Sequence, residues 1–233
     1  MRKHMIALAL LALLPLTAQA QEGDESGFNW NAALTSEYMF RGISQSDDQP
    51  ALQAGAGYSW GNGLYVGAWA SNVDFNEGTD AEVDVFVGWN GDLGENVNLD
   101  VQLVRYNYVG EPSGVDYAYN ELIGKLSFAE NYSVTLGYTN DFLASDTDSV
   151  YLGLGGDWDI GKGYRLTAGV GYTTIDDKLG GVDGYVDYSV GVNRDFGKVN
   201  VALGYHGTNA DAEDFFGRDN AEDKFVLTFS IGG

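Results

Sequence analysis

Ten charged or titratable side chains occupy the polar positions of an alternating pattern that repeats along the chain. They are Glu37, Arg41, Glu82, Asp84, Asp100, Glu121, Lys125, Arg165, Asp187 and His206. Acidic and basic groups that line a water-filled passage set up a field across it and favour one sign of ion. We therefore predict that these residues line a pore. Whether pairs such as Glu37 with Arg41 only satisfy a polar interior is left open.

Catalysis has little support in the residue pattern. The sequence has two histidines, and one of them, His4, lies in the N-terminal leader discussed below. A serine hydrolase needs a histidine between a nucleophile and an orienting group, and no serine stands out as a partner for His206. We predict no catalytic residue and no cofactor. A lipid hydrolase remains the least favoured alternative.

Three acidic segments carry carboxylates, which hard cations prefer as ligands. They are Asp146 to Asp148, Asp176 to Asp177 and Asp211 to Asp214. None has the spacing of an EF-hand, and the chain contains no cysteine for a thiolate site. We predict no metal site. One alternative stays open, in which these segments hold divalent cations that bridge lipopolysaccharide phosphates.

Strands must position these residues, because the alternation has a period of two. The alternation from Phe28 to Ile43 is longer than an ordinary strand, which has about 5 to 6 residues. Its length is closer to that of a strand that crosses a bilayer, which has roughly 9 to 11 residues. The same pattern predicts further strands at residues 52–60, 64–71, 82–90, 97–105, 121–128, 132–139, 150–158, 164–173, 185–193, 199–206 and 224–231. The facing of residues 64–75 is left open, and a bulge or the membrane edge is expected at Arg105.

Alternation alone does not say which way the apolar face points, because soluble barrels also alternate. Here short and long connections alternate, and most of the acidic residues lie in the long ones, as in outer-membrane barrels. Aromatic residues end the apolar faces: Trp60, Trp89, Phe128, Tyr132, Trp158 and Tyr164 beside short turns, and Tyr38, Phe40, Tyr138, Tyr172 and Tyr205 toward long loops. We predict an all-β fold, an antiparallel up-and-down transmembrane β-barrel of about 12 strands.

The N-terminus has the pattern of a secretory signal peptide. A basic start precedes an apolar run that ends at Leu16, and Ala18-Gln19-Ala20 forms a cleavage site. We assign residues 1–20 to the signal peptide and residues 21–233 to a single barrel domain in the bacterial outer membrane. The net charge of −22 excludes nucleic acid as a partner.

Two blocks of the sequence resemble a known family. Residues 34–45, LTSEYMFRGISQ, resemble the N-terminal signature of the TorF-type porins of Proteobacteria, also called the Gcw family, and residues 67–73, GAWASNV, are similar to its next segment. The resemblance implies an outer-membrane barrel that serves as a channel, with no catalytic residues and no known substrate to carry over. The ending Ile231-Gly232-Gly233 departs from barrels in general, because it lacks a terminal aromatic residue.

These features predict a porin-like channel for passive diffusion of small solutes, and its acidic mouth favours cations. Its partners would be outer-membrane lipid, lipopolysaccharide, and small solutes or cations. The alternative is a non-conducting structural or surface-interaction barrel. The sequence leaves open the solute, the oligomeric state, and whether the pore is open or plugged.

Overall fold

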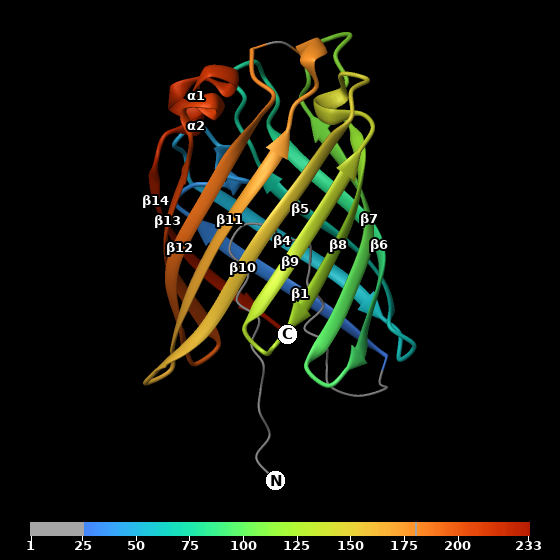
Figure 1. Cartoon of the computed structure of the whole chain (residues 1–233), viewed down its shortest axis with the longest axis vertical. Helices are drawn as coiled ribbons and strands as arrows, with labels where there is room; N and C mark the ends of the chain where they lie inside the picture. The colour runs from blue at the N-terminus through green and yellow to red at the C-terminus, as the bar shows by residue number, and fades with distance from the viewer. Residues whose placement is uncertain (1–25, 180) are drawn as a thin grey trace.

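The computed structural model describes residues 26–179 and 181–233, so the signal peptide predicted at residues 1–20 lies outside the described residues. Twelve strands form a closed antiparallel barrel in which neighbours along the chain pair, and the last strand pairs with the first (Figure 1). The strands are β1 (Gly27–Thr35), β4 (Ala51–Ser59), β5 (Leu64–Asn72), β6 (Ala81–Gly94), β7 (Val97–Val109), β8 (Tyr119–Phe128), β9 (Tyr132–Thr139), β10 (Ser149–Gly161), β11 (Tyr164–Thr174), β12 (Gly184–Phe196), β13 (Val199–Thr208) and β14 (Lys224–Gly232). The predicted fold and strand number are confirmed.

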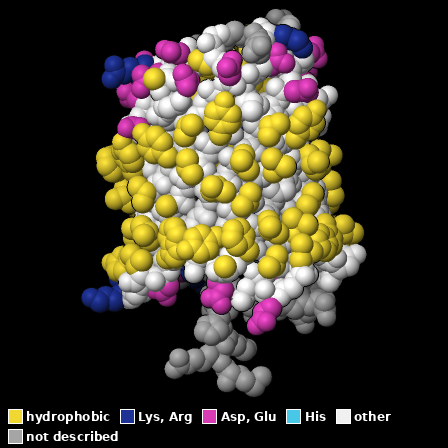
Figure 2. Space-filling view, viewed as in Figure 1, with side chains coloured by type: hydrophobic (Ala, Val, Ile, Leu, Met, Phe, Trp, Pro, Cys, Tyr) yellow, Lys and Arg dark blue, Asp and Glu magenta, His cyan; other side chains and the backbone are white. Residues whose placement is uncertain are grey.

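The outer face of the wall is apolar, because one parity of each strand carries the large apolar side chains. Leu152 and Leu154 of β10 are 48% and 55% exposed. Figure 2 shows such side chains as a band across the visible face of the barrel, with acidic side chains at both ends and more of them at the long-loop end. A band of this kind matches the hydrocarbon layer of a membrane, which is roughly 25 Å tall in barrels of this class. The predicted outward direction of the apolar parity is confirmed.

Short and long connections lie at opposite ends of the barrel, as predicted. The short turns are residues 60–63, 95–96, 129–131, 162–163 and 197–198, and the long loops are residues 36–50, 73–80, 110–118, 140–148, 175–183 and 209–223. The long loops contain η1 (Phe142–Ala144), η2 (Asp177–Leu179), α1 (Ala210–Phe216) and α2 (Arg218–Ala221), all at the end opposite the short turns (Figure 1). Within residues 26–179 and 181–233, none of the helices has the length and hydropathy to cross a bilayer.

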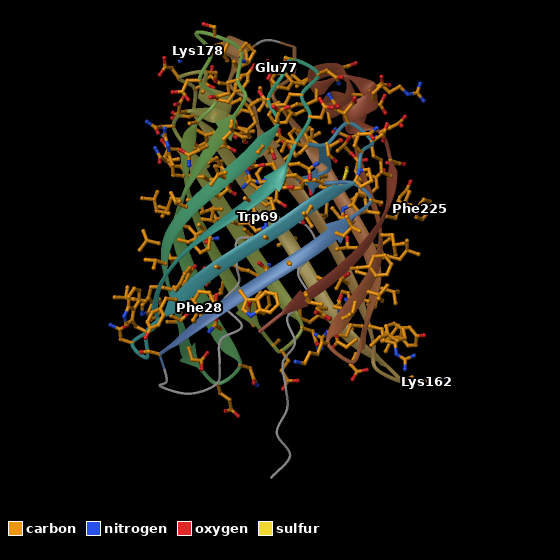
Figure 3. The ribbon with its side chains drawn as sticks, turned by 180° about the vertical axis from the view of Figure 1, so that it is seen from behind. Phe28, Trp69, Glu77, Lys162, Lys178 and Phe225 are labelled. Atoms are coloured by element: carbon orange, nitrogen blue, oxygen red, sulfur yellow. The ribbon has the colours of Figure 1, made fainter. Side chains whose placement is uncertain are left out.

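The facing of β5, which the alternation left open, is set by its large aromatic residues. Tyr65 and Trp69 are buried inside the barrel, while Leu64 and Val66 are exposed on the outer face. Figure 3 shows Phe225 projecting from the outer face of the wall, where it is 73% exposed, in contrast to the 3% exposure of Trp69. The inner face of β5 is therefore aromatic rather than polar.

The first strand is shorter than predicted. β1 ends at Thr35 instead of continuing to Ile43, and residues 36–50 leave the wall. Within this loop β2 (Met39–Phe40) and β3 (Ile43–Ser44) pair as a hairpin. Its two turn residues, Arg41 and Gly42, have φ angles of 48° and 79°. A two-residue turn of this kind reverses the chain without breaking the alternation, so the pattern did not reveal it.

One further prediction was wrong. Tyr38 and Phe40, expected in the outer aromatic girdle, lie inside against Trp69 and Tyr106, with ring centroids 5.4 and 6.1 Å apart. They do not join the girdle because the hairpin places them in the lumen.

At Arg105 the sequence predicts a bulge or the membrane edge. β7 continues in register with both neighbouring strands past that residue, so there is no bulge there, and the membrane edge stays a prediction.

Candidate functional site

The hairpin of β2 and β3 fills part of the lumen, and its turn rests against the wall. A Cβ added to Gly42 would lie 2.6 Å from Cγ2 of Thr208 in β13 and 3.0 Å from Cβ of Asp187 in β12. The positive φ of Gly42 also disfavours any other residue. Glycine at this position therefore lets the turn approach the wall closely.

A buried ion pair holds the hairpin from another side. Nη2 of Arg41 lies 2.7 Å from Oε1 of Glu121 in β8, and the two side chains are 3% and 2% exposed. The hydroxyl of Tyr106 donates to the second oxygen of Glu121 at 3.0 Å. Gly137 in β9 leaves room for the pair, since a Cβ there would lie 3.0 Å from Nη2 of Arg41. A buried charge pair is costly to break, because either partner alone is left without compensation.

The base of the hairpin is tied by a carboxylate outside the membrane-spanning strands. Glu37 accepts hydrogen bonds from the hydroxyl of Ser44 and from the backbone N–H of Asp48. Burial raises the pKa of Glu37, although the hydrogen bond from Ser44 and the charge of Lys224 oppose that shift. Asp48 also pairs with Lys224 of β14, so the loop is fastened to the wall on this side.

Large aromatic residues fill the lumen along β5 to β8. The buried members of this aromatic cluster are Tyr65, Trp69, Phe86, Val104, Tyr106, Tyr119 and Ile123, with Tyr38 of the hairpin loop and Tyr108 packed against them. Tyr106 and Tyr119 stack with ring centroids 4.7 Å apart. This side of the barrel is packed like a protein core, and the hairpin is part of the packing.

A second apolar cluster closes the long-loop end, and the hairpin also joins it. Ile43 packs with Phe142, Ile175, Tyr185, Ala212 and Ala221, which come from the long loops and β12, and Phe215 and Phe216 of α1 pack against this cap. The outer entrance is therefore covered by loop residues that rest on the hairpin.

Beneath the hairpin, the lumen is hollow along β9 to β12. A cavity of about 180 Å³ extends from Arg41 and Gly42 to the turn between β8 and β9. Its walls include small inward residues, Ser133, Thr135, Gly153, Gly155, Gly169 and Ser189. Its charged residues are Arg41, Lys125, Glu130, Asp157, Arg165 and Asp187, with His206 beside them. The cavity is polar and carries both signs of charge.

The ten predicted pore residues fall into three places. Arg41, Lys125, Arg165, Asp187 and His206 line the cavity. Glu37 and Glu121 hold the hairpin, as described above. Glu82, Asp84 and Asp100 lie along the aromatic cluster, where Asp100 accepts a hydrogen bond of 2.7 Å from the Tyr65 hydroxyl. Whether any of them lines a conducting path stays a prediction.

One histidine, His206, lies in the lining of the cavity. His206 stands opposite Ser189 across the β12–β13 pairing, but no hydrogen bond joins these two described residues. The sequence contains a G-x-S-x-G motif, the pattern around the nucleophile of many serine hydrolases, at Gly57 to Gly61. Its Ser59 ends β4 beside a short turn, whereas His206 lies near the long-loop end of β13. The two are too far apart for a serine hydrolase.

Metal chemistry has no further support. Among residues 26–179 and 181–233, no three His, Cys, Asp or Glu side chains come together as a metal site requires. The Arg165 side chain, which lies near the short turns, is paired with Asp157 at 2.8 Å. Carboxylates inside the barrel therefore pair with side chains of the protein or remain without a partner.

Sequence reasoning missed the hairpin and the inward aromatic residues, although a signal for the latter was present. Tyr106, Tyr119 and Tyr151 stand on the polar parity of their strands, and Tyr65 and Trp69 share one face of a strand whose facing the alternation left open. An aromatic residue at a position expected to be polar marks a filled lumen. For the hairpin, the only local signal is Arg41-Gly42, because glycine favours a positive φ in a tight turn.

The fold is similar to those of solved outer-membrane channels. The NanC porin matches with a TM-score of 0.54 and 10% identity over 88% of this chain and 98% of its own. The COG4313 outer membrane channel from Pseudomonas putida F1 matches with a TM-score of 0.54 and 13% identity over 94% and 98%. The KdgM porin in complex with disordered oligogalacturonate matches with a TM-score of 0.50 and 9% identity over 89% and 96%.

Sequence comparison gives a family but no characterised relative. The family described as "Bacterial protein of unknown function (Gcw_chp)" matches residues 19–231. No curated protein matches the chain. The fold, the apolar band and the family match together describe an outer-membrane β-barrel with the architecture of a channel.

Proposed function

The chain belongs to the Gcw family, and from that premise we propose that it is a porin of the TorF type, through which small solutes diffuse passively. In the conformation described above, the hairpin closes the passage. The observation that supports this most is the polar cavity beneath the hairpin. A barrel with only a structural role gains nothing from small residues and unpaired charges in its interior, because packed side chains would stabilise it more.

The charge at the two ends supports a preference for cations. Aspartate and glutamate dominate the long loops, whereas Glu95 and Glu130 of the short turns are balanced by Lys162 and Lys198. An acidic mouth raises the local concentration of cations and lowers that of anions. Cations and zwitterions would therefore enter from the outer side more readily than anions.

The channel opens only when the hairpin moves away from its position in the lumen. Thr35 at the end of β1 and Ala51 at the start of β4 are direct partners in the sheet. A short glycine-serine turn can therefore replace residues 36–50 without disturbing the wall. We expect this variant to conduct at least about ten-fold better than the intact protein, because the hairpin that fills part of the lumen is gone.

The measurement is single-channel recording of the purified full barrel in planar bilayers. The matched control shortens residues 110–118, a long loop whose Tyr117 contacts Glu77 and Phe75 rather than the hairpin loop. The control should conduct like the intact protein, because residues 36–50 keep their contacts with the wall. Equal conductance of the hairpin variant and the intact barrel would contradict the proposal, and reversal potentials that show anion preference would contradict its selectivity.

One observation favours a second candidate, a non-conducting barrel that acts through its surface. The aromatic cluster and the apolar cap together fill much of the lumen. In this role the acidic loops would contact lipopolysaccharide or other surface partners, and the apolar band would contact outer-membrane lipid. A hairpin variant that folds and inserts but passes no current would support this candidate.

A further inference from the structure

Two buried polar atoms of opposite character, at the hairpin end of the cavity, have no partner. Nε of Arg41 is a donor and Oδ2 of Asp187 is an acceptor, and neither makes a hydrogen bond within the protein. Both residues line the cavity. A buried polar atom without a partner costs free energy, so such atoms in a native structure commonly face a bound molecule or water.

The protein keeps these two atoms apart. The Arg41 guanidinium lies over the ring of Tyr151, 4.1 Å from its centroid, and its Nη2 is engaged with Glu121. The hydroxyl of Tyr151 and Oδ2 of Asp187 both lie against the wall at Gly171, within contact distance of a Cβ placed there. Arg41 and Asp187 are thus both neighbours of Tyr151, and no hydrogen bond joins their two free atoms.

The space beside them is sized for a small molecule. At about 180 Å³, the cavity is below the roughly 300 to 1,000 Å³ of sites that hold drug-sized ligands. Glycines at positions 153, 155 and 169 leave this space open along β10 and β11. Side chains at these positions would fill it, so the hollow depends on the sequence of two neighbouring strands.

Charge complementarity selects the chemical class of ligand. A simple anion that reaches Arg41 meets the carboxylate of Asp187, and a simple cation that reaches Asp187 meets the guanidinium. A molecule with both charges close together satisfies both atoms and brings no net charge into the lumen. Oligogalacturonate, the molecule in the KdgM complex, is a polyanion and does not fit this arrangement.

We propose that the hairpin end of the cavity binds a small zwitterion of the α-amino-acid type. Its carboxylate accepts from Nε of Arg41, and its ammonium group donates to Oδ2 of Asp187. The assignment rests on the proposed channel function, because it names the class of solute that dwells in the passage. Ser189, two residues from Asp187 along β12 and also in the cavity lining, leaves room for a short polar or apolar side chain.

The test is calorimetric titration of the purified, detergent-folded full barrel with three probes: L-alanine, acetate and methylammonium. Alanine carries both charges, and each of the other two carries one. We expect alanine to bind at least about ten-fold more tightly than either, a difference of about 1.4 kcal/mol. This comparison needs no variant, so a folding defect cannot confuse it. Acetate or methylammonium binding as tightly as alanine would overturn the assignment.

A variant tests the named acceptor. Asp187→Asn should weaken alanine binding by at least about ten-fold, because the amide carries no charge to attract the ammonium group. Glu95→Gln makes the same carboxylate-to-amide change in a short turn outside the cavity, and it should leave binding unchanged. An unchanged affinity for alanine in the Asp187→Asn variant would contradict the proposed site.

Conductance of the same preparations separates the two proposals. A barrel that conducts but shows no preference for alanine refutes only the zwitterion site. A barrel that binds alanine but never conducts, even without its hairpin, refutes only the channel.

Discussion

The two sides of the lumen are built on the same wall yet have opposite interiors. Along β5 to β8 the inward positions carry Tyr65, Trp69, Phe86 and Tyr106, which pack into a cluster. Along β9 to β12 many inward positions are glycine, serine or threonine, and the lumen is hollow. The outward positions on both sides are apolar. The bilayer therefore requires apolar residues only at the outward-facing positions. The residues at the inward-facing positions determine whether the interior is filled or open.

The difference extends to buried polar atoms. On the packed side, Nε1 of Trp69, Oε2 of Glu82 and Oδ1 of Asp84 have no partner and are enclosed by aromatic rings. On the hollow side, the partnerless atoms of Arg41 and Asp187 border a cavity. Side chains on the hollow side line space that water or solute can occupy, whereas those on the packed side lie against other side chains. We infer that packing secures the structure on one side and passage uses the other.

The largest expected effect is on the packed side. Trp69→Ala removes the centre of the aromatic cluster and should lower the free energy of unfolding by about 4 kcal/mol, because the neighbouring rings collapse only partly into the space. Ser133→Ala, on the hollow side, should change it by less than about 0.5 kcal/mol. Equilibrium urea unfolding of the barrel in phospholipid vesicles measures both. Similar losses for the two variants would mean that the sides do not differ in packing.

Breaking the ion pair between the hairpin and the wall should have the next largest effect. Arg41→Gln leaves the Glu121 carboxylate buried and unpaired, at a cost of about 3 kcal/mol. The pair of Arg165 with Asp157 is equally short, at 2.8 Å, but its side chains are 24% and 20% exposed. Arg165→Gln should therefore cost less than about 1 kcal/mol. The same unfolding assay compares them.

A double variant gives the control for this comparison. Combining Arg41→Gln with Glu121→Gln removes both charges and should recover part of the loss, because no uncompensated charge then remains in the lumen. If the double variant is as unstable as the sum of the single ones, the two residues are not energetically coupled. The hairpin would then be held by its other contacts.

The wall of this barrel could be predicted from the sequence, and its interior could not. The band of Leu152, Leu154 and Val170 alternates without interruption, because a lipid-facing surface accepts only apolar residues over a fixed height. Interior positions follow no such rule. Gly169 and Trp69 both occupy inward positions, and nothing local says that one leaves a hollow and the other fills it.

The hairpin is the clearest case of this limit. Its residues alternate like those of a wall strand, since Tyr38 and Phe40 are apolar while Glu37 and Arg41 are charged. Its tertiary contacts distinguish it from a wall strand. Arg41 pairs with Glu121, 80 residues away in the chain, and Gly42 packs against Asp187. Contacts at such sequence separations are set by closure of the barrel and leave no trace in the local pattern.

Glycines on the two sides of the lumen differ in their surroundings, and we expect substitutions there to have smaller effects. A Cβ at Gly169 would lie 3.3 Å from Oγ of Ser189, a side chain that can move, whereas a Cβ at Gly88 would meet the ring of Tyr65. Gly169→Val should fold normally and reduce the conductance of the hairpin-free barrel about two-fold, because it narrows the hollow side. Gly88→Val should reduce folding yield instead. Unchanged conductance of the Gly169 variant would place the ion path elsewhere.

The smallest expected effect is a pH dependence of the closed state. The pKa of Glu37 is raised by burial above the ordinary value of 4.5. A carboxyl group with a raised pKa in the folded state stabilises that state fully below pH 4.5, and the contribution is lost as the pH rises through the raised value. Acid should therefore hold the hairpin more firmly, and openings of the intact barrel should become rarer on acidification from neutral pH. Channel recordings in a pH series measure the frequency of openings.

The variant Glu37→Gln distinguishes the titration of this carboxyl group from that of the other charged groups around the hairpin. The amide resembles the protonated acid, and Asp48 and Lys224 keep their pairing in the variant. Openings should then be rare at every pH in the series, with the slope between neutral pH and acid much reduced. A pH response that persists in Glu37→Gln would assign the titration to another group. A response that also persists after residues 36–50 are replaced would show that it comes from the wall and not from the hairpin, because the hairpin is then absent.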